Sequence, residues 1–217
     1  MRDKKAVAAL VNIFDPLLFV ETGDELNNPE LFRLLCAPNA DLKPAALVER
    51  YKRILSAGME PAILPALPML IEKVVSPLVS SKAAFVAGNP LGTIALCGFV
   101  AEMIALMLYE MARDEGRAAD VTMDQFEHCG QKERVKILHG QDIINQETKE
   151  AFDLIRDIRR RYIHFISKDH SLVFEDALRV YAKSISLLID LVGQEFHNGA
   201  WVPKPSFERY LTKHGLL

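Results

Sequence analysis

Four arginines and a histidine lie close together near position 160 of the chain. Arg156, Arg159, Arg160 and Arg161 fall within six residues, and His164 follows them. A guanidinium presents its donors in a planar fork that suits phosphate, and an imidazole takes up and releases protons near neutral pH. The chemistry to weigh in this segment is therefore phosphate binding and proton transfer.

The spacing of these residues limits how they can act together. At about 100° per residue on an ideal helix, Arg156, Arg159 and Arg160 share one side, whereas Arg161 points elsewhere. Arg159 and His164 are five residues apart and so about 140° apart on the helix. They reach one ligand together only if the helix end unwinds or a second chain completes the site.

A plainer interpretation also fits the same residues. Positive charges near the C-terminus of a helix interact favourably with its dipole, by about 0.3–1 kcal/mol each. Runs of charge are most often a solvated helix face, and His164 would then be a capping or half-buried histidine. The sequence by itself leaves this alternative open.

Other sites of known pattern are missing from the sequence. There is no phosphate-binding loop of the P-loop type, no dinucleotide glycine pattern, no H-E-x-x-H and no G-x-S-x-G. His128 and Cys129 are adjacent, but no second ligand pair follows at zinc spacing. No histidine is preceded by glutamate three residues earlier, as di-iron bundles require. We therefore expect no metal site and no cofactor.

The elements that must position the arginines are helices. Apolar residues recur at three- and four-residue steps, and no segment alternates with period two for long enough to predict a sheet. With their start and stop signals, these patterns predict helices over residues 4–14, 29–36, 41–56, 61–86, 90–113, 123–128, 131–139, 145–166 and 172–196. Pro77 should kink or split one helix, and the tail after Gly199 should be extended. The sequence predicts an all-α fold.

Composition places the chain among ordinary globular proteins. Half of the 217 residues are hydrophobic and a quarter are charged, which excludes a disordered chain. The net charge of −3 provides no global positive field for nucleic acid, so any RNA contact must come from a local basic cluster. The three cysteines are widely spaced, which favours reduced thiols over disulfides.

The most apolar segment, residues 94–111, contains Gly98, Glu102 and Glu110. A membrane span is longer and carries few or no charges, so a helix at the centre of a bundle fits better. The chain begins with charged residues and has no signal-peptide pattern. We expect a cytoplasmic protein without a membrane partner.

Residues 85–193 resemble the HEPN family, named for higher-eukaryote and prokaryote nucleotide binding. In that family a long hydrophobic helix bears a glutamate, and a helix ending in R-x-x-x-x-H and a last long helix follow a connecting region. The counterparts here are residues 94–113 with Glu102, residues 134–138, residues 147–166 with Arg159 and His164, and residues 172–196. The segment IRDIRRRYIHF is close to the family's usual IRxxRNxxxH. The resemblance implies an up-and-down helical bundle of HEPN type with an additional N-terminal helical segment.

Many members of this family are metal-independent endoribonucleases, often toxins, that act as dimers with a shared groove. The resemblance implies that His164 acts as base or acid on a ribose 2′-hydroxyl and that Arg159 stabilises charge on the phosphate. It implies RNA or a nucleotide as ligand and a homodimer, whose two-fold axis would remove the angular difficulty. Other members are non-catalytic binding modules, antitoxins or regulators such as the mannitol repressor group. That alternative, with a protein partner, stays open.

Four further residues belong to the candidate binding site. Arg160 stands where the family commonly has asparagine or aspartate, so it either removes a positioning residue or adds phosphate affinity. Glu102 in so apolar a helix needs a partner, and Arg156 or Arg159 is the expected one. Tyr162 is either a core residue or part of the site.

The resemblance also divides the chain. Residues 1–80 are expected to be an N-terminal helical extension of unknown role, residues 81–200 the HEPN-like bundle, and residues 201–217 a C-terminal tail.

Overall fold

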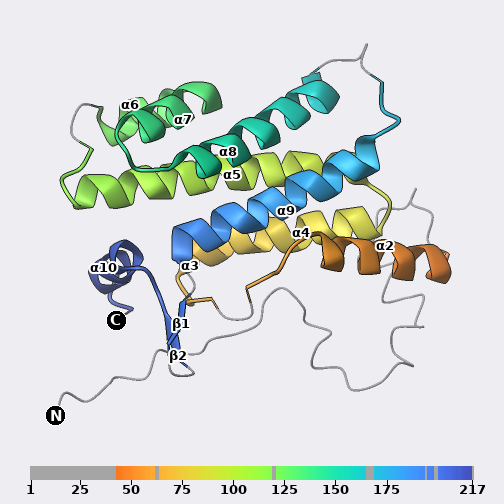
Figure 1. Ribbon diagram of the computed structural model, residues 1–217, viewed down its shortest axis with the longest axis horizontal. Helices are drawn as coiled ribbons and strands as arrows, with labels where there is room; N and C mark the ends of the chain where they lie inside the picture. Colours follow the sequence, from red (N-terminus) through yellow and green to blue (C-terminus); the bar gives the residue numbers. More distant parts are fainter. Residues whose placement is uncertain are drawn as a thin grey trace.

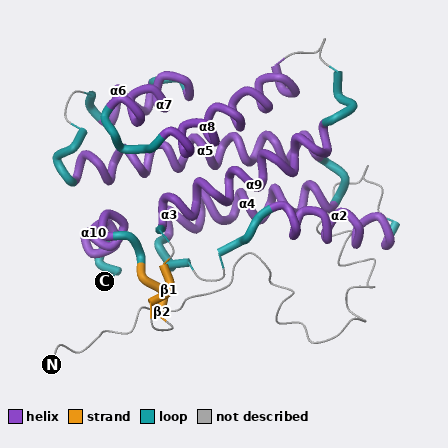
Figure 2. Tube along the Cα trace, viewed as in Figure 1, coloured by secondary structure: helices purple, strands orange, loops and turns teal. Residues whose placement is uncertain are grey.

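A computed structural model describes residues 43–61, 64–118, 121–164, 169–193, 195–197 and 200–216. Most of these residues are helical, and the only strands among them form one short hairpin (Figure 2). The all-α class expected from the sequence is confirmed. The expected helices over residues 4–14 and 29–36 lie outside the described residues.

Four helices surround the main core. α5 (Pro90–Asp114) crosses the middle of the molecule, with α8 (Gln146–Arg159) on one side and α9 (Val173–Val192) and α4 (Ser76–Val86) on the other (Figure 1). The Asn89 side chain accepts a hydrogen bond from the first turn of α5, as an N-cap does. α5 is buried along most of its length, which confirms its expected central place.

Two short helices, α6 (Met123–His128) and α7 (Gln131–Gly140), cover the C-terminal half of α5. Thr122 and Gln125 cap α6 reciprocally, each side chain accepting from the other's backbone N–H. The buried Arg134 side chain of α7 donates 3.1 Å from Nε to the carbonyl of Phe126 in α6. The two helices therefore form one unit, and both lie where the sequence predicts them.

The helix expected over residues 61–86 begins later and is interrupted. It starts at α3 (Pro68–Leu70), because proline disfavours helical geometry in the residue before it, and Leu67 is accordingly extended. A π-helical segment, η3 (Ile71–Val75), then leads into α4. Pro77, the second residue of α4, lacks an N–H group, so the expected disruption takes the form of a widened turn before it.

α2 (Pro44–Ala57) packs on α4 and α9 and ends at Gly58, close to the expected bounds. Just after it, Glu60 accepts from Lys82 Nζ of α4 at 3.0 Å and from the Tyr181 hydroxyl of α9 at 2.6 Å. Burial raises the pKa of Tyr181, and the Glu60 carboxylate raises it further. This buried contact ties the N-terminal segment to the bundle.

The end of α9 differs from the expected helix over residues 172–196. The helix stops at Val192, because Gly193 adopts a φ of +66°, and a Cβ there would overlap the side chain of Lys204. The chain then forms an antiparallel hairpin of β1 (Glu195–His197) and β2 (Ala200–Val202). The helix prediction was wrong by about one turn.

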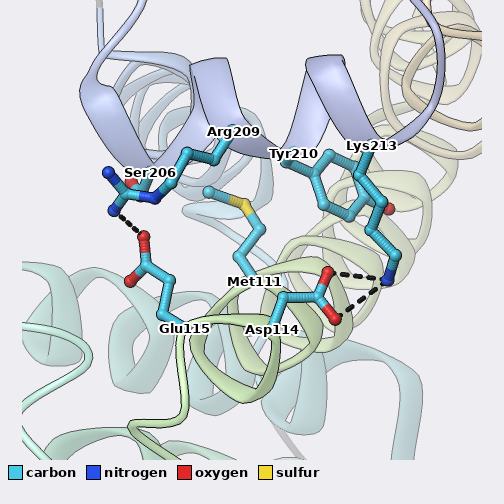
Figure 3. Close-up of a pocket in the computed structure, with 7 residues that line it drawn as sticks. All are labelled: Met111, Asp114, Glu115, Ser206, Arg209, Tyr210 and Lys213. Atoms are coloured by element: carbon cyan, nitrogen blue, oxygen red, sulfur yellow. Dashed lines mark hydrogen bonds and ion pairs between the residues drawn. The ribbon is translucent and has the colours of Figure 1, made fainter.

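The C-terminal tail is not extended beyond the hairpin but forms α10 (Pro205–Lys213). Phe207, Tyr210 and Leu211 are buried at helical spacing, and Pro205 occupies the first helical position, where proline is tolerated. Figure 3 shows α10 beside the end of α5, where Lys213 pairs with Asp114 at 2.8 Å. The prolines of the tail suggested an extended chain, whereas one of them starts a helix.

The two boundaries expected between parts of the chain, at residues 80 and 200, fall inside secondary-structure elements. Residue 80 lies within α4 and residue 200 within β2. Buried residues from α2 to α10 belong to one hydrophobic cluster. The described helices before residue 80 thus pack on the bundle, and their apolar sides complete its core.

Candidate functional site

The arginine-rich segment spans a change of helix type. α8 ends at Arg159, and η4 (Arg160–His164) continues it as a π-helix. Backbone hydrogen bonds of a π-helix join residues five apart rather than four. Because Arg159 and His164 are five apart, the wider turn brings their backbone positions toward the same side of the helix. The side chain of His164 lies outside the described part of the structure.

Arg159 is anchored on α5. Its Nη1 donates to a carboxylate oxygen of Glu102, so one of the two partners expected for that glutamate is confirmed. About a third of each side chain is exposed, 33% for Arg159 and 30% for Glu102. The stem of Arg159 crosses α5 at Gly98, where a Cβ would overlap its Cδ. The glycine therefore makes room for the arginine.

One donor of Arg159 is left unused. Its Nε is buried and has no hydrogen-bond partner among the described residues. A buried donor without an acceptor costs about 1–3 kcal/mol. The guanidinium is thus held by a carboxylate on one side and would gain from an additional acceptor.

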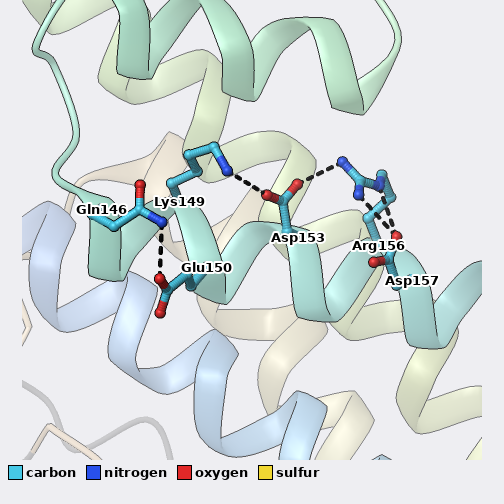
Figure 4. A network of polar contacts seen from close by, with 6 residues as sticks. All are labelled: Gln146, Lys149, Glu150, Asp153, Arg156 and Asp157. Carbon is cyan, nitrogen blue, oxygen red and sulfur yellow. Dashed lines mark hydrogen bonds and ion pairs between the residues drawn. The ribbon is translucent and has the colours of Figure 1, made fainter.

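Arg156 does not join Arg159. It pairs with Asp153 at 2.6 Å and with Asp157 at 2.8 Å, and Asp153 also accepts from Lys149 at 2.9 Å (Figure 4). These contacts all lie along α8 itself. Arg156 and Arg159 share a helix side by spacing, but their guanidinium groups pair with different acids.

Arg161 and Tyr162 meet a buried acid on α9. Asp176, which is 2% exposed, accepts from the Tyr162 hydroxyl at 2.8 Å and from Arg161 Nη1 at 3.1 Å. Its other oxygen accepts from Arg179 at 2.8 Å. Burial raises the pKa of Tyr162, and its hydrogen bond to Asp176 raises it further. Because the carboxylate holds two consecutive residues of η4, it fixes the π-helical segment against α9.

Sequence reasoning missed Asp176 and Arg179. Asp176 stands four residues before Val180 and eight before Ser184, both buried. An acid in the buried stripe of a helix needs a partner, so this spacing could have indicated it. Tyr162 is a buried residue whose ring meets His170 edge-on at 5.2 Å between ring centroids.

Arg160 is exposed. Next to η4, a shallow hollow of about 230 Å³ is lined by Arg161, Tyr162, Asp169, Ser171 and Leu172. The Ser171 hydroxyl and backbone N–H bond to Asp169 and lower the pKa of that carboxyl. The hollow therefore presents one half-exposed guanidinium beside a carboxylate.

Among the described residues no three histidine, cysteine or acidic side chains are grouped as metal ligands. Cys97 is buried, and burial raises its pKa to about 11. Its thiol is therefore protonated at neutral pH and a poor ligand. Cys129 is also unbridged, and Cys36 lies outside the described residues.

α5 is the one helix in the described part of the chain that is long and apolar enough to cross a membrane. More than half of its most apolar window, 56%, is buried within the bundle. Core helices of soluble proteins meet the same criteria of length and composition.

No family model matches the chain, and no curated protein or solved structure matches it either. The likeness to the HEPN family accordingly depends on the arginine-rich segment and the order of the helices.

Proposed function

We propose that the protein is a HEPN-type helical bundle that binds RNA phosphate at Arg159, Arg160 and His164. The observation that carries the proposal is the half-exposed Arg159, anchored on Glu102 at the residue where α8 becomes π-helical. The wider turn supports joint action of positions 159 and 164, which an α-helix would separate.

A homodimer is part of this proposal. Leu91 and Phe99 are 39% and 37% exposed and lie on the side of α5 that bears Glu102. Ile163 is 41% exposed and stands four residues after Arg159, hence on the same side of its helix. An apolar surface around the Arg159–Glu102 pair suits a two-fold interface. Each chain would then bring its arginine and histidine to one groove.

In such a groove the chemistry is cleavage without a metal. His164 of one chain takes the proton of a ribose 2′-hydroxyl, and the 2′-oxygen attacks the adjacent phosphorus. The bond from phosphorus to the 5′-oxygen breaks, and the histidine of the second chain protonates that oxygen. The products are a 2′,3′-cyclic phosphate and a 5′-hydroxyl, while Arg159 stabilises the charge on the phosphate in the transition state.

A second candidate is a non-catalytic regulatory or interaction protein of the same fold. The ion pairs of Arg156, Arg159 and Arg161 favour it, because each guanidinium already meets a carboxylate of this chain. An arginine that is paired within the fold has fewer donors for a ligand. Arg160 also favours the non-catalytic candidate, because it replaces the small polar residue that the HEPN family commonly has at this position.

An RNA cleavage experiment distinguishes the nuclease from the non-catalytic protein. Single-stranded RNA is incubated with the wild type and with His164→Ala, both in the presence of a chelator. His128→Ala is the matched control, because His128 is exposed on α6, away from the arginine-rich segment. The nuclease predicts cleavage by the wild type and the control, and a loss of at least a hundredfold in His164→Ala.

Binding of the same RNA, measured by fluorescence anisotropy at several salt concentrations, separates the remaining outcomes. Salt-dependent binding that Arg160→Glu weakens, without cleavage, supports a non-catalytic RNA-binding protein. Neither binding nor cleavage would remove RNA as the ligand. Equal cleavage by the wild type and His164→Ala would assign the activity to a contaminant.

A further inference from the structure

Arg161 is the arginine of the basic segment that packs toward α9 rather than α5. Its Nη1 donates to one carboxylate oxygen of the buried Asp176 at 3.1 Å, and Nη1 of Arg179 donates to the other oxygen at 2.8 Å. One carboxylate therefore holds two guanidinium groups next to each other, from two different helices. We call Arg161 and Arg179 the paired arginines.

The paired arginines keep donors for a ligand. A guanidinium has five N–H groups, and the contacts with Asp176 use one in each. The side chains of Arg161 and Arg179 are 48% and 59% exposed, whereas that of Asp176 is almost fully buried. Two positive charges share one negative charge, so the cluster has a net charge of +1. A phosphodiester carries a single negative charge, and guanidinium forks bind phosphate oxygens in pairs, so the cluster suits one phosphodiester group.

The neighbouring acids indicate the side from which a phosphate would approach. Asp169 lines the hollow beside Arg161, where its carboxylate would repel a phosphate. A second hollow, of about 320 Å³, is bordered by Arg179 and by Arg53 and Glu175, which pair with each other at 2.6 Å. The charge of Glu175 is thus already compensated. We expect the phosphate against Arg179, away from Asp169.

Arg160 connects the paired arginines with the site proposed at Arg159. Consecutive residues of an α-helix are about 100° apart, and each step is smaller in a π-helix because its turn holds more residues. Arg159 contacts α5 and Arg161 contacts α9, so the exposed Arg160 lies between them around the helix. Three consecutive arginines thus lead around the end of α8 from one neighbouring helix to the other.

We propose that the paired arginines bind a second phosphodiester of the same RNA, and that the strand reaches them across Arg160. This second contact rests on the proposed RNA ligand and lies outside the site at Arg159. A free phosphate anion on the same two guanidinium groups is the competing ligand.

Arg179→Gln tests the contact without releasing η4, because Asp176 still accepts from Tyr162 and Arg161. Binding of a fluorescein-labelled, single-stranded oligouridylate is measured by anisotropy over a range of salt concentrations. The variant should bind at least fivefold more weakly at low salt. Its slope of log affinity against log salt should be shallower by about 0.7, the value for one phosphate contact on a single strand. Arg179→Lys keeps the charge and should retain the slope.

Arg113→Gln is the matched control, because it removes the same charge from another exposed position. Arg113 stands fifteen residues after Gly98, about 22 Å further along α5 from the place where Arg159 crosses it. Its affinity should stay within twofold of that of the wild type, and its salt slope should be unchanged.

The outcomes separate this contact from the proposed function. Equal affinity and slope in the wild type and Arg179→Gln would overturn the second contact, while Arg160→Glu still tests the first. A loss in Arg179→Gln but not in Arg160→Glu would support the paired arginines and count against the site at Arg159. No RNA binding by the wild type would remove both.

Inorganic phosphate at constant ionic strength distinguishes the free anion from the RNA strand. The proposal predicts that Arg179→Gln loses RNA affinity whether or not phosphate is present. If phosphate raises the melting temperature of the wild type but not of Arg179→Gln, and both bind RNA equally, the ligand is a free anion and the proposal is wrong.

Discussion

At the scale of single residues, Gly98 and Arg159 depend on one another. A glycine inside a helix costs about 0.5–1 kcal/mol relative to alanine, and Gly98 lies well inside α5. The stem of Arg159 occupies the space that a Cβ at position 98 would need. The glycine is thus explained by the arginine that passes over it, and not by backbone conformation.

We therefore predict that Gly98→Ala acts differently in two backgrounds. In Arg159→Ala, where the stem is gone, it should stabilise the fold by about 0.5–1 kcal/mol through helix propensity. In the wild type this gain should be absent or reversed, because Arg159 must move off Glu102. Urea unfolding of the four proteins measures the coupling as a double-mutant cycle. The same change in both backgrounds would show that the two residues do not interact.

The residues around η4 show how far the sequence reached at this scale. Spacing and residue type indicated Arg159 and the pairing of Glu102 with an arginine. They did not identify Asp176 as the acid that Arg161 and Tyr162 share, because the choice among the acids of the chain depends on how η4 packs on α9. The roles proposed for Arg159, Arg160 and His164 stay predictions.

At the scale of elements, α10 is attached by apolar side chains and by ion pairs at the end of α5. The pKa of Glu115 lies below its ordinary value of 4.5. Burial by itself would raise this pKa, but hydrogen bonds from Arg209 and Arg117 lower it by more. A carboxyl whose pKa is lowered by folding stabilises the fold at pH values above its ordinary pKa. That contribution is lost as the pH falls through the lowered pKa. The contact between Glu115 and α10 should accordingly weaken below about pH 4.5.

We predict that acid loosens α10 before the bundle. Between pH 6 and pH 3.5, hydrogen exchange in α10, corrected for intrinsic rates, should accelerate relative to α5. In Glu115→Gln, exchange should already be faster at pH 6 and should change less with pH, because position 115 no longer titrates. Equal pH dependence in both proteins would show that Glu115 does not hold the helix.

The helix boundaries that the sequence predicted correctly depend on local signals, whereas those that it missed depend on tertiary contacts. Caps and prolines predicted α2, α5, α6 and α7 closely, because these signals act within one turn. They failed at the end of α9, where Gly193 accommodates the side chain of Lys204 from after the hairpin. They also failed for α10, whose buried residues are explained by α5 beside it.

At the scale of the whole molecule, the surface around Arg159 and Glu102 decides whether the proposed site is shared. We predict that Phe99→Asp weakens dimerisation at least tenfold, because the interface would bury an unpaired carboxylate. Sedimentation velocity measures this at concentrations at which the wild type is dimeric. Met59→Asp, on the far more exposed residue after α2, should leave the assembly unchanged. A wild type that is monomeric throughout would remove the composite site.

The amino-acid sequence was enough to predict that this protein is helical, that α5 lies at its centre and that basic residues cluster near position 160. These properties follow from apolar spacing, caps and residue types, which act over a few residues. Only the folded chain shows that the segment after Arg159 is π-helical, that Glu102 pairs with Arg159 rather than with Arg156, that Arg161 pairs with Asp176, and that α10 joins the core. The physical reason is that each of these depends on groups from helices far apart in the chain, whose approach only packing can fix.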